Sequence, residues 1–140
     1  MTPRISLITL GVQDLARARR FYLDGLGFTP APGSNDDVTF IDCDGLVLAL
    51  WKRAALVEDA KVTDGSGFGG VTLAHNCRDR ETVDHTLEEV ERAGAKILKP
   101  AQETFWGGYS GYFADPDGFV WEVAHNPFWK IDEAGHVRLG

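Results

Sequence analysis

The 140-residue chain has few of the features that mark secreted, membrane-spanning or disulfide-rich proteins. Its only cysteines, Cys43 and Cys77, form no C-x-x-C motif, so we expect two reduced thiols and no disulfide. No apolar run approaches the ~20 residues that span a bilayer, and we expect no membrane partner. The N-terminus lacks the apolar region and cleavage site of a secretory signal, so the expected location is the cytoplasm.

Positive charge is also scarce. The sequence has 14 Lys and Arg residues against 21 Asp and Glu residues, which gives a formal net charge of −7. The only basic cluster, residues 17–20, is short, so we expect no nucleic-acid partner. Hydrophobic residues make up 44% and charged residues 25%, as in ordinary globular domains, and the length predicts one domain.

The first half predicts a strand, a helix and three more strands. Residues 5–12 are rich in β-branched and apolar side chains, which favours a strand. Asp14 is a suitable N-cap for the helix that follows, where apolar residues recur at helical spacing. The further strands are expected at residues 28–32, 38–43 and 46–51, the last two joined by the turn signal Asp44-Gly45.

The second half predicts the same order. Asp79 can cap a second helix, which Gly94 ends, and Pro100 is expected to stop the short strand after it. The strands are expected at residues 70–77, 95–98, 105–113 and 119–125. A small hairpin around Ala134-Gly135 is expected in the tail, which we predict to pack on the body or on a partner chain.

The two halves therefore form an internal repeat. Asp44-Gly45 and Asp117-Gly118 precede matching strands, and Leu7 and Gly70 take matching places in the two first strands. The predicted fold is α+β: two paired βαβββ modules whose strands curl into a cup, with helices on the outer face. The expected segments are module one at about 4–52, a connector at 53–67, module two at about 68–126 and a tail at 127–140.

Several short motifs carry a resemblance to a known family. They are Val12-Gln-Asp-Leu15, Phe21-Tyr22, Leu26-Gly27-Phe28, Ala93-Gly94-Ala95 and the run from Tyr112 to Val123 with its Asp-Pro-Asp-Gly turn and Trp-Glu pair. From residue 4 to about 127 the chain resembles the vicinal oxygen chelate superfamily of glyoxalases, bleomycin-resistance proteins and extradiol dioxygenases. The resemblance implies a small-molecule cup and a homodimer, with the cup formed within one chain or across the interface.

The resemblance also implies four metal-ligand positions, of which this chain keeps one. They fall on Leu7, Ala49, Gly70 and Glu122. Only Glu122 carries a group that can coordinate a metal ion, so we expect no cofactor. The alternative is a divalent metal such as Zn, Ni, Mn or Fe at a displaced site, where His75 would join Glu122. We predict Glu122 as the catalytic group, a general acid or base, or as the contact for a cationic ligand.

The predicted ligand contacts follow from strand alternation and from an aromatic, glycine-rich stretch. Alternation places Thr72 and Asn76 on the face of Glu122, and His75 on the helix side. The candidate wall residues are the aromatics Trp51, Trp106, Tyr109 and Tyr112. The alternative for the stretch around residue 106 is packing against the tail aromatics Phe128 and Trp129.

Two classes of function remain. The first is a protein of the glyoxalase and bleomycin-resistance type that binds a small organic molecule in an acidic, aromatic-lined cup without metal. The second is an enzyme of the glyoxalase type: a metal-dependent or Glu-based lyase, isomerase or dioxygenase. A Glu-based enzyme would abstract a proton next to a carbonyl, with Glu122 as the base.

Overall fold

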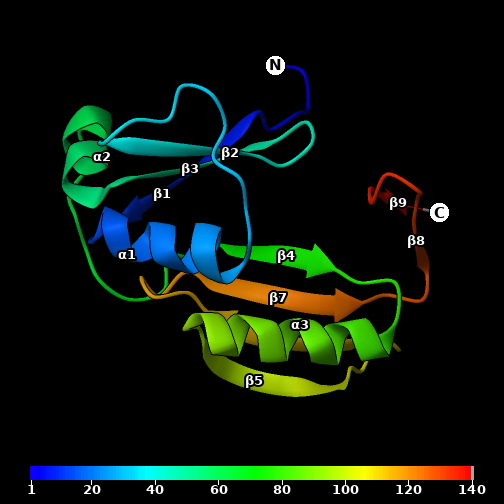
Figure 1. Cartoon of the computed structure of the whole chain (residues 1–140). Coiled ribbons are helices and arrows are strands. Elements are labelled where there is room, and N and C mark those ends of the chain that lie inside the picture. Colours follow the sequence, from blue (N-terminus) through cyan, green and yellow to red (C-terminus); the bar gives the residue numbers. More distant parts are fainter. Residues whose placement is uncertain (140) are drawn as a thin grey trace. The chain divides into compact units, whose positions relative to one another are not determined.

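Two separate sheets organise the chain in the computed structural model, which describes residues 1–139 (Figure 1). They belong to two compact units, Met1–Gly69 and Gly70–Gly140. A third, two-stranded sheet is formed by the tail. The predicted α+β class is confirmed. In the described part of the chain, no helix is long and apolar enough to cross a membrane.

Unit one contains a three-stranded sheet and three helical segments. Its elements are β1 (Leu7–Val12), α1 (Leu15–Arg19), the π-helix η1 (Arg20–Gly25), β2 (Val38–Asp42), β3 (Val47–Lys52) and α2 (Arg53–Ala60). The strand order is β1-β3-β2, in which β3 runs parallel to β1 and antiparallel to β2.

The first helical segment begins as the sequence predicts. The Asp14 carboxylate accepts a hydrogen bond from the backbone N–H of Arg17 at 3.0 Å, so it caps α1. The apolar stripe then buries Phe21 and Tyr22 in the core. The Tyr22 ring also stacks on Phe28, with ring centroids 6.1 Å apart. These contacts hold the helical segment inside unit one.

One expected strand of unit one is missing, and the expected connector contains a helix. The strand predicted at 28–32 is reduced to one bridge, between Pro30 and Ile41, because a proline has no N–H for a ladder. Residues predicted as a connector form α2, which ends where Lys61 takes a positive φ of 54°. Helix α2 buries no residue completely, so no apolar stripe predicted it. It packs close to β1, where a Cβ at Gly11 would lie 3.1 Å from the Leu56 side chain.

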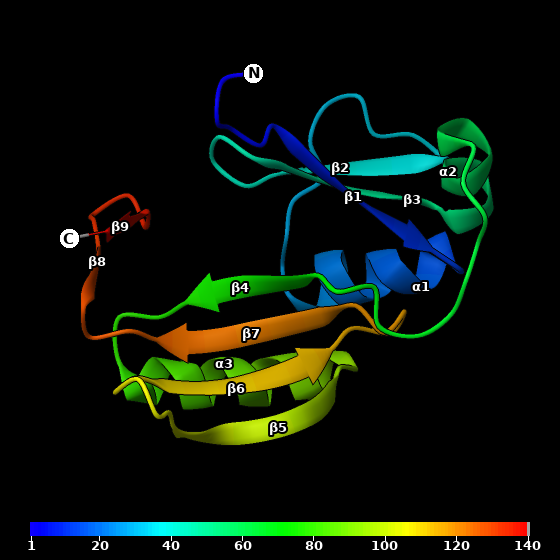
Figure 2. The same cartoon turned by 180° about the vertical axis from the view of Figure 1, so that it is seen from behind.

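Unit two has the predicted βαβββ order followed by a hairpin (Figure 2). Its elements are β4 (Thr72–Asn76), α3 (Arg80–Ala93), β5 (Lys96–Glu103), β6 (Tyr109–Ala114), β7 (Val120–His125), β8 (Trp129–Ile131) and β9 (Val137–Leu139). The strand order is β4-β7-β6-β5, with β4 parallel to β7 and the other pairs antiparallel. The tail strands β8 and β9 pair antiparallel, which confirms the predicted hairpin.

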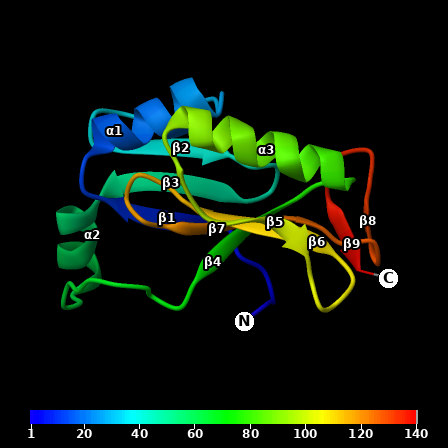
Figure 3. The same cartoon turned by 90° about the horizontal axis from the view of Figure 1, so that it is seen from below.

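Helix α3 covers one face of this sheet (Figure 3). It begins at its N-cap Asp79 and ends at Gly94, whose φ of 112° favours glycine. Its buried residues are Val83, Leu87 and Val90, as the predicted stripe requires. The helix lies so close to β6 that a Cβ at Gly111 would stand 2.7 Å from Leu87 Cδ1.

Strand β5 is longer than predicted. It continues through Pro100 to Glu103 because it is an edge strand, and its register against β6 shifts twice between Ile97 and Gln102. A proline is tolerated at such irregular edge positions, since its missing N–H breaks no ladder bond. Strand β6 begins later than predicted, at Tyr109, because a turn closed by the Thr104 hydroxyl, which accepts from Gly108 N, precedes it.

The Asp-Pro-Asp-Gly turn before β7 is held by its first residue. The buried Asp115 carboxylate accepts hydrogen bonds from the backbone N–H groups of Asp117 at 2.9 Å and Phe119 at 2.8 Å. Gly118 adopts a φ of 86° within the same turn. This conspicuous part of the sequence therefore has a structural role: it starts β7 in the register that places Glu122.

Strand pairing corrects one predicted equivalence within the repeat. Leu7 pairs with Val47 in unit one, and Thr72 pairs with Val120 in unit two. Because Val47 and Val120 start the matching strands β3 and β7, Thr72 takes the place of Leu7. Gly70, the predicted match, lies before β4.

Candidate functional site

The candidate site lies on the face of the unit-two sheet that points away from α3. Gly111 contacts Leu87 of α3, and its register partner is Val123, so Val123 also points toward the helix. Successive side chains of a strand alternate between faces, which puts Glu122 on the opposite face. We call this surface the Glu122 face; it comprises Thr72, Ala74, Asn76, Ser110, Tyr112 and Glu122.

Tyr112 is the neighbour of Glu122 on β6. The two residues are register partners on β6 and β7, and both are half-buried. Desolvation, the negative charge of Glu122 and hydrogen bonding to its carboxylate raise the pKa of the Tyr112 hydroxyl. The phenol therefore keeps its proton at neutral pH and can donate a hydrogen bond to the carboxylate. On the other side of Glu122 stands Ala74, which offers no polar group.

Two further predicted contacts share this face. Thr72 and Asn76 lie on β4, two residues before and two residues after Ala74, the partner of Glu122. Because strand side chains alternate, both point to the same face as Ala74. Thr72 is exposed and Asn76 is half-buried. The structure thus brings Thr72, Asn76 and Tyr112 together with Glu122, as the sequence predicts. Their contacts with a ligand remain predictions.

Tyr109, a predicted wall residue, lies on the face of the sheet opposite to Glu122. Its hydroxyl donates a hydrogen bond of 2.7 Å to Asp84 on α3, and this bond is the main reason that its pKa is raised. The Arg80 guanidinium lies 5.3 Å from the centroid of the ring. These contacts join β6 to α3, so Tyr109 serves the helix face of the sheet.

The two tryptophans of the predicted wall belong to different units. The Trp106 ring covers Gly108 closely: a Cβ at Gly108 would lie 1.9 Å from the ring. A Cβ at neighbouring Gly107 would lie 3.5 Å from Phe128, so this stretch does pack against the tail. Trp51 lies on β3 of unit one, where it pairs with Gly11 of β1. Ligand contacts by Trp51 and Trp106 remain predictions.

His75 points to the helix side of the sheet, as predicted. Its neighbour Ala74 is the partner of Glu122, so alternation directs His75 away from the Glu122 face. Neighbouring atoms partly desolvate the ring and lower its pKa, while the negative charge of Glu89 on α3 opposes this shift. His75 and Glu122 therefore lie on opposite faces and cannot share a metal ion.

The donor set does not fit a divalent metal. Among residues 1–139, no group of three or more His, Cys, Asp or Glu side chains is placed to hold one. With the corrected register, the four ligand positions that the resemblance implies fall on Leu7, Ala49, Thr72 and Glu122. They supply two hydrocarbon side chains, one hydroxyl and one carboxylate, which is too few strong ligands for such a site.

Cys43 and Cys77 are both free thiols, as the sequence predicts. Desolvation is the main cause that raises the pKa of Cys77, whose Sγ lies 3.8 Å from the Thr86 hydroxyl. Desolvation also raises the pKa of Cys43, which lines a pocket of about 210 Å³ in unit one. At neutral pH both thiols are protonated, so neither is an activated nucleophile.

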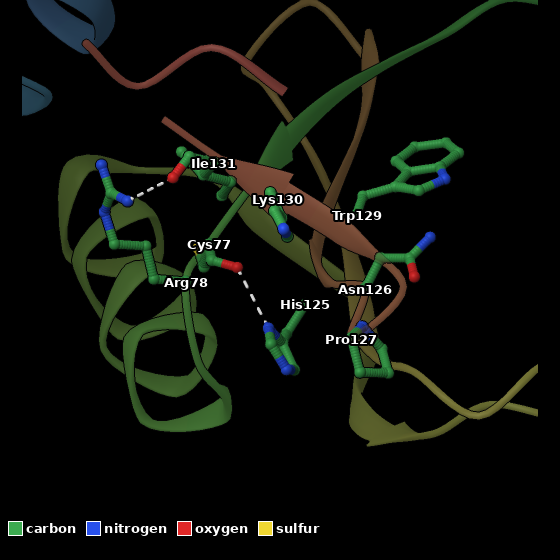
Figure 4. Close-up of a pocket in the computed structure, with 8 residues that line it drawn as sticks. All are labelled: Cys77, Arg78, His125, Asn126, Pro127, Trp129, Lys130 and Ile131. Atoms are coloured by element: carbon green, nitrogen blue, oxygen red, sulfur yellow. Dashed lines mark hydrogen bonds between the residues drawn. The ribbon is translucent and has the colours of Figure 1, made fainter. Parts of the chain in front are cut away.

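Sequence reasoning missed a pocket of about 380 Å³ at the end of unit two (Figure 4). We call it the tail pocket; it is lined by Cys77, Arg78, His125, Asn126, Pro127, Trp129, Lys130 and Ile131. These residues come from the end of β4, the end of β7 and the tail. No local pattern in the sequence indicates that the tail returns to this place.

Comparison with known proteins agrees with the geometry. The family model for the Glyoxalase/Bleomycin resistance protein/Dioxygenase superfamily matches residues 4–123. A glyoxalase-related enzyme from Fulvimarina pelagi is 40% identical, with 99% of each chain covered and a TM-score of 0.91. A lactoylglutathione lyase from Agrobacterium tumefaciens is 23% identical, with coverage of 94% of this chain and 100% of that one and a TM-score of 0.70.

A family enzyme from Burkholderia phytofirmans PsJN is 21% identical, with 86% of this chain and 96% of that chain covered and a TM-score of 0.76. A comparison with curated proteins gave no significant match. The two structures below 25% identity support the fold alone, whereas the family model covers most of the chain. The chain therefore belongs to the glyoxalase/bleomycin resistance protein/dioxygenase superfamily.

Proposed function

We propose that this protein binds a small organic molecule on the Glu122 face without a metal ion. The observation that carries the proposal is the pairing of Glu122 with Tyr112 on a face where Thr72 and Asn76 add polar groups. A carboxylate, a phenol, a hydroxyl and an amide make a hydrogen-bonding surface suited to an organic ligand. Of the four ligand positions that the resemblance implies, only Glu122 carries a strong metal ligand, which supports binding without a metal.

The expected ligand carries a cation or a strong hydrogen-bond donor. Glu122 is the only acidic residue among the six residues of the Glu122 face, and its register partner Tyr112 is a neutral phenol. On β5, Lys99 is the register partner of Tyr112 and adds a positive charge at the edge of this face. A ligand ammonium, amidinium or N–H group would give the carboxylate a stronger partner. The net charge of −7 favours the approach of such cations over that of anions.

A homodimer is part of this proposal. Closed two-fold pairing is the commonest form of oligomer, and the family resemblance favours it. Light scattering coupled to size-exclusion chromatography measures it directly: the proposal predicts the mass of two chains, and the mass of one chain would contradict it.

The closeness of Glu122 and Tyr112 also supports a second candidate, a metal-independent lyase or isomerase. The Glu122 carboxylate would take a proton from a carbon next to a carbonyl group, and the electron pair would move onto the carbonyl oxygen. Tyr112, which keeps its proton at neutral pH, can donate a hydrogen bond to that oxygen. With an α-hydroxy carbonyl substrate, the same carboxylic acid would return the proton to the former carbonyl carbon, while the hydroxyl proton passes to the former carbonyl oxygen, so the carbonyl and hydroxyl groups exchange places.

Calorimetric and NMR titrations with three matched probes test the binding proposal. Benzamidine, benzamide and benzoate have similar shape but carry positive, zero and negative charge. We expect benzamidine to bind best at the Glu122 face, with shifts at Tyr112, and Glu122→Gln to weaken it at least about threefold through loss of the charge. Glu88→Gln removes an equal charge from the exposed surface of α3 and should leave this binding unchanged.

Equal effects of the Glu122 and Glu88 variants would contradict the proposal, as would the lack of saturable binding at this face. The enzyme candidate is separated by turnover. If Glu122 is the base, Glu122→Gln abolishes turnover of a carbonyl substrate that it still binds, whereas a pure binding site shows no turnover in either form.

A further inference from the structure

The tail pocket is a built feature, because hydrogen bonds from the body hold the tail in place. The Arg78 guanidinium donates to the backbone carbonyls of Ile131 at 2.7 Å and Asp132 at 2.6 Å. The loop that leads into the tail is closed by the Asn126 side chain, which accepts from the backbone N–H of Phe128 at 2.9 Å. The pocket walls therefore stay in place without a ligand.

The wall of the tail pocket formed by Cys77 and His125 is held by the pairing of β4 and β7. The backbone N–H of Cys77 donates to the carbonyl of Ala124 at 2.7 Å, which continues the pairing of β4 and β7. The Nδ1 atom of His125 lies 3.2 Å from the Cys77 carbonyl oxygen and donates to it in the Nδ1–H tautomer. This contact fixes the orientation of the His125 ring in the lining.

The lining has positive charge and no carboxylate. Arg78 and Lys130 are both cationic at neutral pH, and the eight lining residues include neither Asp nor Glu. Figure 4 shows the Lys130 side chain ending between the Cys77 wall and the Asn126 wall. No ion pair within residues 1–139 occupies its ammonium group. The lining thus carries two positive charges in a chain of net charge −7.

The nearest carboxylates along the chain are already bound elsewhere. Asp132 accepts from Arg138, whose Nη2 lies 2.7 Å away, and the pKa of Asp132 is lowered mainly by its bond to the backbone N–H of His136. Asp79 caps α3 through Thr82, and this bonding lowers its pKa. Both carboxylates carry a negative charge at neutral pH, and the charge of Asp79 also acts on His125 of the lining. Within residues 1–139, neither forms an ion pair with Lys130.

The remaining lining is amide and apolar surface. The Asn126 carbonyl oxygen is used within its own loop, which leaves its NH₂ group free to donate to a ligand. Pro127, Trp129 and Ile131 supply apolar surface, and the indole offers a flat face. A ligand that satisfies all of these groups has an anionic end and a planar apolar part.

We propose that the tail pocket is a binding site for a small organic anion, a carboxylate or phosphate attached to a planar apolar group. The Lys130 ammonium and the Asn126 amide bind the anionic oxygens, while Trp129 and Pro127 contact the planar part. Arg78 is a positioning residue, since its guanidinium holds the tail that forms the wall. This site is separate from the Glu122 face in position and opposite to it in charge.

NMR titration of the isotope-labelled full chain tests this inference with named probes. Benzoate and phenyl phosphate should give saturable shifts at residues 77–78 and 125–131, and the tighter of the two identifies the anion class. Benzamide and benzamidine should bind there at least about threefold more weakly, since they lack the negative charge. Added salt should weaken the two anions more than it weakens benzamide.

Lys130→Gln should weaken benzoate binding at least about threefold. The matched control is Lys96→Gln, which removes the same charge from exposed β5 and should leave benzoate binding unchanged. Equal effects of the two variants, equal binding of benzamide and benzoate, or no saturable anion shifts at these residues would each overturn the inference. The comparison of probes uses the unmodified chain, so it stands even if a variant fails to fold. Benzamidine binding at the Glu122 face is read from different resonances, so either site can fail alone.

Discussion

Tyr112 and Glu122 stand opposite each other on β6 and β7, and the carboxylate helps to raise the pKa of the phenol. The pairing follows from two local features of the chain. The Asp115 turn starts β7 in register, and Gly111 allows α3 to approach the other face of β6. The geometry of the Glu122 face therefore depends on the Asp115 turn and on the packing of α3 against the opposite face of the sheet.

Removing the charge of Glu122 should lower the pKa of Tyr112. In the folded chain this pKa lies above the ordinary value of 10.0, so the phenol stabilises the fold while it is protonated. That contribution is present below pH 10 and is lost as the pH rises through the folded-state pKa. In the Glu122→Gln variant, the stabilisation by the protonated phenol should be lost at a lower pH than in the unmodified protein. Titration of ¹³C-labelled tyrosine by NMR measures it.

Tyr109 is the internal control for this titration. Its raised pKa is due first to the hydrogen bond with Asp84, on the helix face of the sheet. Glu122→Gln should leave its titration unchanged, whereas Asp84→Asn should lower it. A Tyr112 titration that is the same with and without the Glu122 charge would show that the two side chains do not interact.

Adding a methyl group at Gly111 should destabilise unit two. A Cβ there would lie 2.7 Å from Leu87 Cδ1 and 2.8 Å from the Lys99 carbonyl oxygen, so helix or strand must shift. Overpacking of this kind costs about 1–3 kcal/mol in the free energy of unfolding. Gly69→Ala is the matched control, since no atom lies within 4 Å of its added Cβ. Urea unfolding compares the two, and equal midpoints would rule out close packing at Gly111.

Loss of the Arg78 side chain should release the tail hairpin. Arg78→Ala removes two hydrogen bonds to the backbone carbonyls of Ile131 and Asp132. Hydrogen exchange at β8 and β9 should then become faster while exchange in α3 stays the same. Arg78→Lys should restore little protection, because one ammonium does not match two carbonyls as a planar guanidinium does. Unchanged exchange in β8 and β9 would show that other contacts hold the tail.

Much of unit two could be predicted because its signals are local. Asp79 and Gly94 mark both ends of α3, and the spacing of Val83, Leu87 and Val90 marks its buried face. Alternation along the strands also places His75 and Glu122 on opposite faces, since no bulge intervenes in β4 or β7. These predictions need only neighbouring residues in the chain.

The errors arise where distant segments decide the outcome. Helix α2 has no apolar stripe and packs through Leu56 near Gly11, a contact that periodicity does not show. Pro100 stays within β5 because that strand lies at a sheet edge. By contrast, the place of Tyr109 was predictable, since alternation along the expected strand puts positions 109 and 112 on opposite faces. The tail pocket needs the tail to fold back onto Arg78.

Metal content is the measurement that tests the account most directly. The purified, untagged protein is exposed to Zn, Ni, Mn and Fe, separated from free ions and analysed by mass spectrometry, with Glu122→Gln alongside. Since Glu122 is the only strong ligand at the four family positions, the account predicts a ratio near zero for both proteins. A ratio near one ion per chain that is lost in Glu122→Gln would contradict it and show a metal centre built around Glu122.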